Sequence, residues 1–377
     1  MDLSALPFDT TSMLARLRPW IECESPTYDP AAVSRAVALA ARDAAAAGGQ
    51  VDHIPGPDGL GDCARIRFPH KDAGTPGILV MGHFDTVHPI GTLEKLPFRH
   101  EGNQCWGPGL LDMKGGTFTA LEALIQLTRA GIETPLPITF LFTSDEEIGS
   151  PGTRALIEEE AKTHKYVLVP EPGLADKGVT TGRYAIARYK LTAYGRASHA
   201  GATLKEGRSA IREMARRIPE IEDMTSDDCT FSVGVVHGGQ WVNCVATTCS
   251  GEALSMAKRQ EDLDRGTTRI LALNERREDG TGFEVKTSVV RPVWEPNAGS
   301  LALHALAKSI AGELGFDLPH RSSPGGSDGN FTGALGIPTL DSLGPCGGDY
   351  HTLNEHIRID TMAERGRLIA GLMARLS

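Results

Sequence analysis

The 377-residue sequence has few aromatic residues, no excess of basic residues and no long apolar run. Its 38 lysines and arginines face 48 aspartates and glutamates, which gives a formal net charge of -10. An acidic surface repels a phosphate backbone and an anionic membrane, so neither nucleic acid nor a membrane is the expected partner. No apolar stretch approaches the length of a membrane span. These absences leave a small molecule as the expected ligand.

Paired cysteines are lacking as well. The seven cysteines show no CxxC spacing, and an odd number favours reduced thiols over a disulfide framework. The opening residues, MDLSALPFDTTSML, contain no basic region followed by a long apolar run, so we expect no secretory signal. Both features predict a cytoplasmic protein.

Aliphatic segments and helical segments alternate through the first half of the chain. The segments GILVM, PITFLF and KYVLVP are near-continuous aliphatic runs, and GGTFTALEALIQLTRAG and GTRALIEEEAKTH between them are typical of helices. This alternation predicts an α/β fold whose mostly parallel sheet is covered by helices on both faces. In such sheets, ligands bind just beyond the carboxyl ends of the strands.

The pattern changes between residues 182 and 291. Half-exposed strands such as YAIARYKLTAYG and two helices, SAIREMARRIPEIE and EDLDRGTTRILALNERR, predict a small α+β domain. After residue 291 the sequence pattern of the first half of the chain returns. The sequence therefore predicts a first domain made of residues 1–181 and 292–377, with a second domain, 182–291, inserted into it.

Acidic residues and histidines recur where the predicted strands end. His83 and Asp85 follow GILVMG, Glu146 and Glu147 follow ITFLFTSD, and Glu171 follows YVLVP. Two further candidates lie in loops, Asp112 in WGPGLLDMKGG and His351 in GGDYHTLNEH. The carboxyl ends of parallel strands meet at one edge of a sheet, so all of these side chains are expected to converge there.

Adjacent carboxylates at such an edge repel one another unless a cation or a proton compensates them. Imidazoles together with carboxylates suit zinc, with manganese or cobalt as alternatives, and the number of ligands fits two ions. Asp85, two residues after His83, is expected to hold its ring, and one of the two adjacent glutamates is free to act as a base. Each motif alone has a plainer interpretation: a structural histidine, an acidic first turn of a helix, or an ordinary loop.

The ordered set of motifs resembles a known family. GHFDTV, WGPGLLDMKGG, FTSDEEIGSPGTR, LVPEPG, GRASHAG, GGSDGNFTGALGIPT and GGDYHTLNEH are similar, over almost the full length, to the di-zinc metallopeptidases. That family includes bacterial glutamate carboxypeptidases, acetylornithine and succinyl-diaminopimelate deacetylases and aminoacylases. The chain most resembles the glutamate carboxypeptidase branch.

The resemblance implies a role for each candidate. Asp112 bridges two divalent metal ions, His83 and Glu171 complete one site, and Glu147 and His351 complete the other. Glu146 is the general acid/base, and Asp85 orients His83. The inserted domain is a lid and dimerisation domain, which implies a homodimer.

The lid carries two further implied site residues and one departure from the family. His199 in GRASHAG is implied to stabilise the oxyanion, and Asn243 to contact substrate; the plainer interpretation of His199 is a turn histidine. Family members usually carry an Asp-x-Arg motif on a lid strand, but this chain has Leu254 and Met256 there. Methionine cannot clamp a carboxylate. The candidates for that task are Lys258, Arg259 and Arg291. The plainer interpretation of each is a solvated side chain after a strand.

The motifs and the departure at Leu254 and Met256 support three hypotheses for function. The first is a metal-dependent hydrolase that cleaves an amide bond of a small amino-acid conjugate or peptide, as a carboxypeptidase does. The second is a hydrolytic deaminase or amidohydrolase acting on a non-peptide C–N bond, such as an aromatic amide or an arylamine. The third is a non-catalytic relative that only binds, whose usual mark is the loss of ligands or of the base; neither loss is seen.

Overall fold

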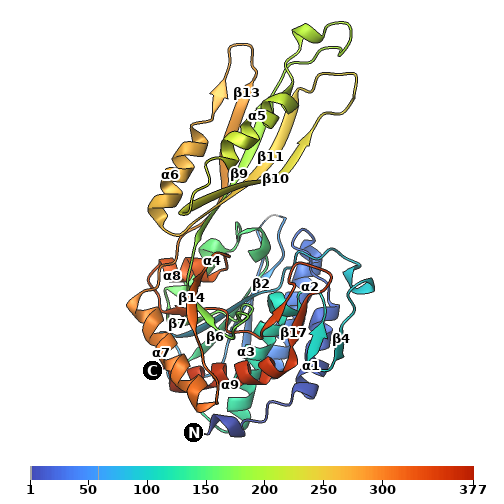
Figure 1. The fold of residues 1–377 in the computed structure, drawn as a ribbon. Coiled ribbons are helices and arrows are strands. Elements are labelled where there is room, and N and C mark those ends of the chain that lie inside the picture. Colours follow the sequence, from blue (N-terminus) through green and yellow to red (C-terminus); the bar gives the residue numbers. More distant parts are fainter. Residues whose placement is uncertain (1, 58) are drawn as a thin grey trace. The chain divides into compact units, whose positions relative to one another are not determined.

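The computed structural model describes residues 2–57 and 59–377, which form two compact units (Figure 1). The first unit contains the residues up to Gly182 together with Glu295–Ser323 and Ser327–Ser377. The second contains Arg183–Trp294 and the short segment Pro324–Gly326. The second unit is thus an insertion in the sequence of the first.

A six-stranded sheet forms the centre of the first unit. In spatial order its strands are β1 (Gln50–Ile54), β2 (Cys63–Arg67), β6 (Ile138–Thr143), β3 (Gly77–His83), β7 (His164–Leu168) and β15 (Thr339–Leu340). β3 pairs in parallel with β6 and with β7, and β7 pairs in parallel with β15. β1 and β2 add an antiparallel edge. The prediction of a mostly parallel sheet is confirmed for its centre.

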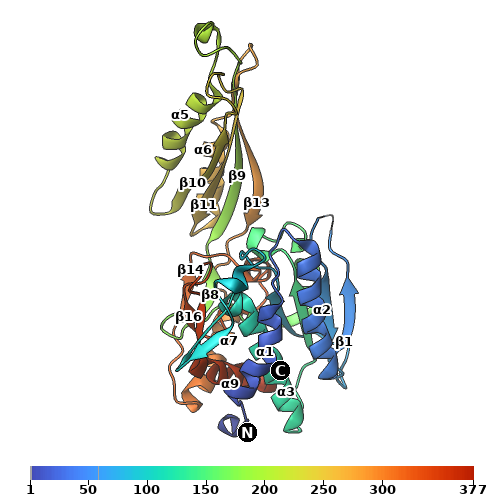
Figure 2. The ribbon, with the colours of Figure 1, turned by 90° about the vertical axis from the view of Figure 1, so that its right-hand side faces the viewer.

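Helices cover both faces of this sheet. α1 (Thr10–Glu22), α2 (Pro30–Ala46), α3 (Gly115–Arg129) and α9 (Ile359–Arg375) share a core with Ile78 and Val80, and α7 (Ala298–Glu313) packs against α9. α4 (Arg154–Ala161) and α8 (Gly329–Ala334) share a core with Leu79 and Met81 on the other face. The side chains of successive β3 residues therefore point to opposite faces of the sheet and belong to different hydrophobic cores. Figure 2 shows α2 lying along β1 at one edge.

Two small sheets lie beside the main one. One has the order β16 (Gly347–Gly348), β17 (His356–Arg358), β5 (Gln104–Trp106) and β4 (Arg99–Glu101). The other pairs β8 (Val179–Arg183) with β14 (His320–Ser323). The pairing of β17 with β5 matters for the site, because it brings the segment that contains His351 next to the segment that leads to Asp112.

The second unit is a five-stranded antiparallel sheet with helices on one face. Its spatial order is β10 (Cys229–Gly238), β11 (Thr248–Ala257), β9 (Ala185–Tyr194), β13 (Gly282–Arg291) and β12 (Glu275–Arg276). α5 (Ala210–Glu222) and α6 (Gln260–Leu271) pack with Tyr189, Phe231 and Phe283 into its core. The predicted α+β architecture of the insertion is confirmed.

Within the described part of the chain, none of the helices has both the length and the apolar character that crossing a membrane requires.

Candidate metal centre

His83 and Asp85 lie where the central strand β3 leaves the sheet. His83 is its last residue and is buried, and its Nδ1 lies 2.9 Å from the backbone oxygen of Asp85 and 3.4 Å from the carboxylate Oδ1 of Asp85. Because β3 ends at His83, strand alternation does not bring the two together. The chain turns after the strand, and Asp85 then faces the back of the imidazole ring.

The carboxylate of Asp85 also fixes the loop that follows β6. Its Oδ1 accepts a hydrogen bond from the backbone N–H of Glu146, and its Oδ2 accepts one from the N–H of Glu147, both at 3.1 Å. Thr27 donates a third bond to Oδ2 at 2.8 Å. Asp85 is fully buried, so these donors offset the cost of removing its charge from water. One side chain thus links His83 to both glutamates.

Asp112 lies between two histidines. It belongs to the segment Leu110–Lys114, inside which Asp112 and Met113 depart from helical backbone angles and are joined by a cis peptide bond. Oδ1 of Asp112 is 3.2 Å from Nε2 of His83, and Oδ2 is 3.1 Å from Nε2 of His351. Each oxygen of the carboxylate therefore faces a different imidazole.

A glutamate accompanies each of these histidines. Oε1 of Glu171 is 3.9 Å from Nε2 of His83, and Oε2 of Glu147 is 3.3 Å from Nε2 of His351. The side chains of Glu171 and Glu147 are 7% and 6% exposed, so neither is an ordinary solvated surface acid. Ligand atoms of His83, Asp112 and Glu147 lie within 4.8 Å of one another. The structure thus brings together all five side chains predicted as metal ligands.

The electrostatics of this cluster require positive charge. Burial raises the pKa of Glu171 well above its ordinary value, and burial also raises the pKa of Glu147. Hydrogen bonds to Asp112 and Glu147 raise the pKa of His351 to about 10. Without a cation the cluster therefore retains protons, which a divalent ion would displace. Buried carboxylates and imidazoles converging on one point are a donor set that fits such an ion.

Glu146 and its neighbour Asp145 have different surroundings. Glu146 begins a single helical turn, Glu146–Ile148, and its charge acts on both His83 and Glu171, which places it beside the cluster. Asp145 instead accepts hydrogen bonds from the backbone of Gly152 and from the backbone and hydroxyl of Thr153. Asp145 stabilises the loop and does not join the other acids.

Glu355 and His88 complete the site, and the sequence pattern did not single them out. The buried carboxylate of Glu355 accepts hydrogen bonds from the backbone N–H groups of Gly109 at 3.1 Å, Leu111 at 2.8 Å and Asp112 at 3.1 Å. His88 Nε2 lies 2.6 Å from the same carboxylate. Glu355 therefore anchors the segment that carries Asp112. The signal was their position: Glu355 lies in the quoted motif GGDYHTLNEH, and His88 directly follows the quoted motif GHFDTV.

The second unit contains His199 and Asn243, which lie on adjacent loops. His199 forms an antiparallel bridge with Cys244, and the backbone oxygen of Asn243 accepts a hydrogen bond from Ala200 N–H at 3.0 Å. Nδ1 of His199 accepts hydrogen bonds from the backbone of Gly201 at 3.1 Å and of Ala202 at 3.0 Å. The proton of a neutral His199 is therefore on Nε2, and the residue is exposed.

Arg291 and the residues of the missing Asp-x-Arg motif share one face of the second unit's sheet. Met256 on β11 is opposite Ile186 on β9, which is in turn opposite Arg291 on β13. Leu254 is opposite Arg188. This face is the one away from α5 and α6, and Arg188 is a cation on it that the sequence pattern did not single out.

Comparison with known proteins identifies relatives of both the sequence and the fold. The model of "Peptidase family M20/M25/M40" matches residues 79–375. Carboxypeptidase G2 of Pseudomonas sp. (strain RS-16) is 33% identical over 319 residues, covering 81% of this chain and 75% of the relative. Succinyl-diaminopimelate desuccinylase of Pseudoalteromonas atlantica is 26% identical over 333 residues, covering 81% and 85%.

Aminopeptidase PepT from Bacillus cereus has the same fold, with a TM-score of 0.75 at 22% identity over 97% of this chain and 98% of its own. Homologues from this family are metal-dependent hydrolases of amide bonds, and the resemblance drawn from the motifs is confirmed. The chain is such a hydrolase and belongs to peptidase family M20/M25/M40.

Proposed function

We propose that the cluster binds two divalent metal ions bridged by Asp112. The observation that carries this proposal is the position of its two carboxylate oxygens, 3.2 Å from His83 and 3.1 Å from His351. His83 and Glu171 would hold one ion, and Glu147 and His351 the other. Zinc suits these imidazole and carboxylate ligands best, and manganese or cobalt would also fit them.

When bound, the ions supply an activated water and polarise the scissile carbonyl group. The task of the protein's own residues is then to position the reactants and move a proton. Asp85 holds the backbone of Glu146 and leaves the Glu146 carboxylate beside the cluster. In that position Glu146 accepts a proton from the attacking water and returns it to the leaving nitrogen.

His199 fits the role of an oxyanion donor. Its Nδ1 accepts hydrogen bonds from two backbone N–H groups, so Nε2–H remains as the donor of the neutral side chain. A neutral donor of this kind stabilises negative charge that develops on a carbonyl oxygen. Asn243, on the paired loop, would contact the substrate.

The second unit also supports a homodimer. β10 is an edge strand of its sheet, and Val235 and Val236 on it are 41% and 43% exposed. Trp241 and Val242 in the following loop are exposed as well. An exposed apolar edge strand is a template for pairing with another chain, so we propose that two copies associate through β10.

The proposed substrate is a small amino-acid conjugate or a short peptide. The names carboxypeptidase and desuccinylase of the relatives support an amide bond as the target. Arg291 lies in the same cross-strand row as Met256 and would bind a substrate carboxylate. The cytoplasmic location is proposed from the reduced state of all seven cysteines.

Replacement of Glu146 by glutamine tests the catalytic role. Glu146→Gln preserves shape but cannot accept the proton, so turnover of N-acyl amino acids should fall by a factor of about 100 or more. Metal content should stay near that of the wild type, because Glu146 is not a proposed ligand. Substantial remaining activity in a fully metal-loaded variant would remove Glu146 from this role.

Leu254 and Met256 favour a second candidate, hydrolysis of a non-peptide C–N bond in an aromatic amide or arylamine. Their apolar side chains stand where the resemblance implies an Asp-x-Arg motif, and they suit an apolar or aromatic group. Product analysis separates the candidates. Released ammonia from an arylamine would support the second, and a released amino acid from a conjugate would support the first.

A further inference from the structure

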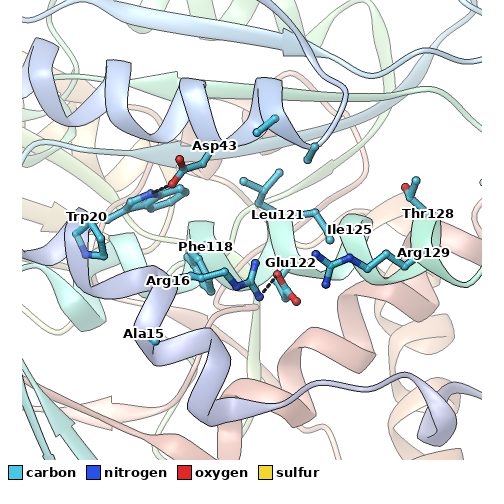
Figure 3. A pocket seen from close by; sticks show the side chains of 13 residues that line it. Ala15, Arg16, Trp20, Asp43, Phe118, Leu121, Glu122, Ile125, Thr128 and Arg129 are labelled. Atoms are coloured by element: carbon cyan, nitrogen blue, oxygen red, sulfur yellow. Dashed lines mark hydrogen bonds and ion pairs between the residues drawn. The ribbon is translucent and has the colours of Figure 1, made fainter.

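A pocket on the first unit lies between α1, α2 and α3 (Figure 3). Its volume is about 550 Å³, within the range of small-molecule sites. The apolar side of the pocket is formed by Trp20, Phe118, Leu121 and Ile125. The rings of Trp20 and Phe118 meet edge to face with centroids 5.4 Å apart.

The pocket is distinct from the metal centre. α3 begins at Gly115, next to the segment that carries Asp112, and ends at Arg129 in the pocket wall. A helix of this length spans about 20 Å at about 1.5 Å per residue. A ligand held near Arg129 would therefore not touch the proposed metal ligands.

Two arginines, Arg16 and Arg129, and two carboxylates, Asp43 and Glu122, line the pocket. Arg16 pairs with the buried carboxylate of Glu122 at 2.6 Å, as Figure 3 shows, and Asp43 pairs with Arg42 at 3.1 Å. The side chain of Arg129 points toward the rim of this pocket and has no hydrogen bond or ion pair to any residue that the structure describes. The unpaired guanidinium group of Arg129 can bind an anion, and a carboxylate matches its planar donors.

A second hollow of about 290 Å³ adjoins the pocket and shares Arg16, Glu122 and Arg129 with it. Side chains that can accept hydrogen bonds are among those lining this second hollow. Gln126 donates its amide N–H to Glu122 at 2.6 Å, which fixes the orientation of the amide. Its Oε1 is buried and receives no hydrogen bond from any described residue, and Asp9 lies in the same wall. A buried acceptor without a donor points to a ligand that supplies one.

We propose that these joined hollows bind a free α-amino acid with an aromatic or branched apolar side chain. The side chain lies against Trp20, Phe118 and Ile125 in the larger hollow. The carboxylate binds Arg129 at the shared rim, and the ammonium group donates to Gln126 Oε1 and Asp9 in the smaller hollow. This assignment rests on the chemistry of the pocket and does not depend on the substrate of the metal centre.

Calorimetric titration of the metal-loaded enzyme with L-phenylalanine tests the proposal. 3-Phenylpropionate lacks the ammonium group and 2-phenylethylamine lacks the carboxylate, so each should bind at least tenfold more weakly than L-phenylalanine. Absence of L-phenylalanine binding, or equal affinity for either truncated ligand, would overturn the proposal.

Variants locate the binding. Arg129→Gln removes the unpaired cation, and Ala46→Trp fills the larger hollow from an exposed position on α2. Each should weaken L-phenylalanine binding at least tenfold while the melting temperature stays near that of the wild type. Arg35→Gln changes an exposed arginine of α2 outside the lining of both hollows, so it is the matched control and should bind normally. Unchanged affinity in both pocket variants would assign the binding to the metal centre and refute the proposed site.

Discussion

At the scale of single residues, Glu355 determines where the proposed bridging ligand lies. Its carboxylate accepts hydrogen bonds from three backbone N–H groups, among them that of Asp112 itself. Glu355 follows His351 by four residues, so one loop supplies both a ligand and the anchor of another ligand. A metal site depends on such supporting contacts nearly as much as on its ligands.

Glu355→Gln should therefore weaken metal binding although it removes no ligand. The amide presents an N–H group to backbone donors that need an acceptor, which disturbs the segment carrying Asp112. We expect a loss of about 10- to 100-fold in metal affinity, measured by competition with a chelator. Glu158→Gln, which breaks an ion pair with Arg154 on α4, is the matched control. Equal affinities in the two variants would contradict a supporting role for Glu355.

The proposed ligands and one support, Asp85, were predictable from the sequence, whereas the support from Glu355 was not. His83, Asp112 and Glu147 combine ligand chemistry with positions at strand ends or in motifs, so residue type and placement agree. Glu355 is an acid in a polar loop, whose usual environment is solvent. Only the tertiary pairing of β17 with β5 shows that it is buried and bonded to the backbone.

At the scale of elements, close packing of α3 positions the loop that carries Glu171. A Cβ atom on Gly116, in the first turn of α3, would lie 1.8 Å from the backbone oxygen of Pro170. Only glycine permits this approach of the helix to the residue before Glu171. The position of the helix and that of the glutamate are therefore coupled.

Gly116→Ala should push the loop away from the helix. We expect the free energy of unfolding to fall by about 1 to 3 kcal/mol from overpacking, and metal affinity to fall with it. Chemical denaturation and chelator competition measure the two effects. Gly312→Ala in α7 is the control, since nothing lies within 4 Å of its added methyl group. That variant should gain about 0.5 to 1 kcal/mol, and a similar gain for Gly116→Ala would refute the close approach.

The long elements could be predicted and the short ones could not. β3 and β6 are continuous apolar runs typical of buried strands, and α3 has a long apolar face. The two-residue strands β15 and β16 are too short to show a period. Their existence depends on partners distant in the sequence.

At the scale of the whole molecule, the proposed dimer depends on the edge strand β10. The double variant Val235→Lys, Val236→Lys places charges on this edge and should yield monomers in sedimentation experiments where the wild type forms dimers. Val51→Lys on β1 is the control, because Val51 is 40% exposed on the edge strand of the other sheet. A monomeric wild type, or a double variant that stays dimeric, would contradict association through β10.

The number of metal ions bound per chain decides whether Asp112 bridges two sites. Chelator-treated protein should be dialysed against Zn²⁺ and its metal content measured, for the wild type and for Asp112→Ala. We predict two ions per wild-type chain and weakened binding of both in the variant, because Asp112 faces both histidines. A wild-type protein that takes up no divalent ion, or a variant that still binds two with unchanged affinity, would contradict the bridged centre.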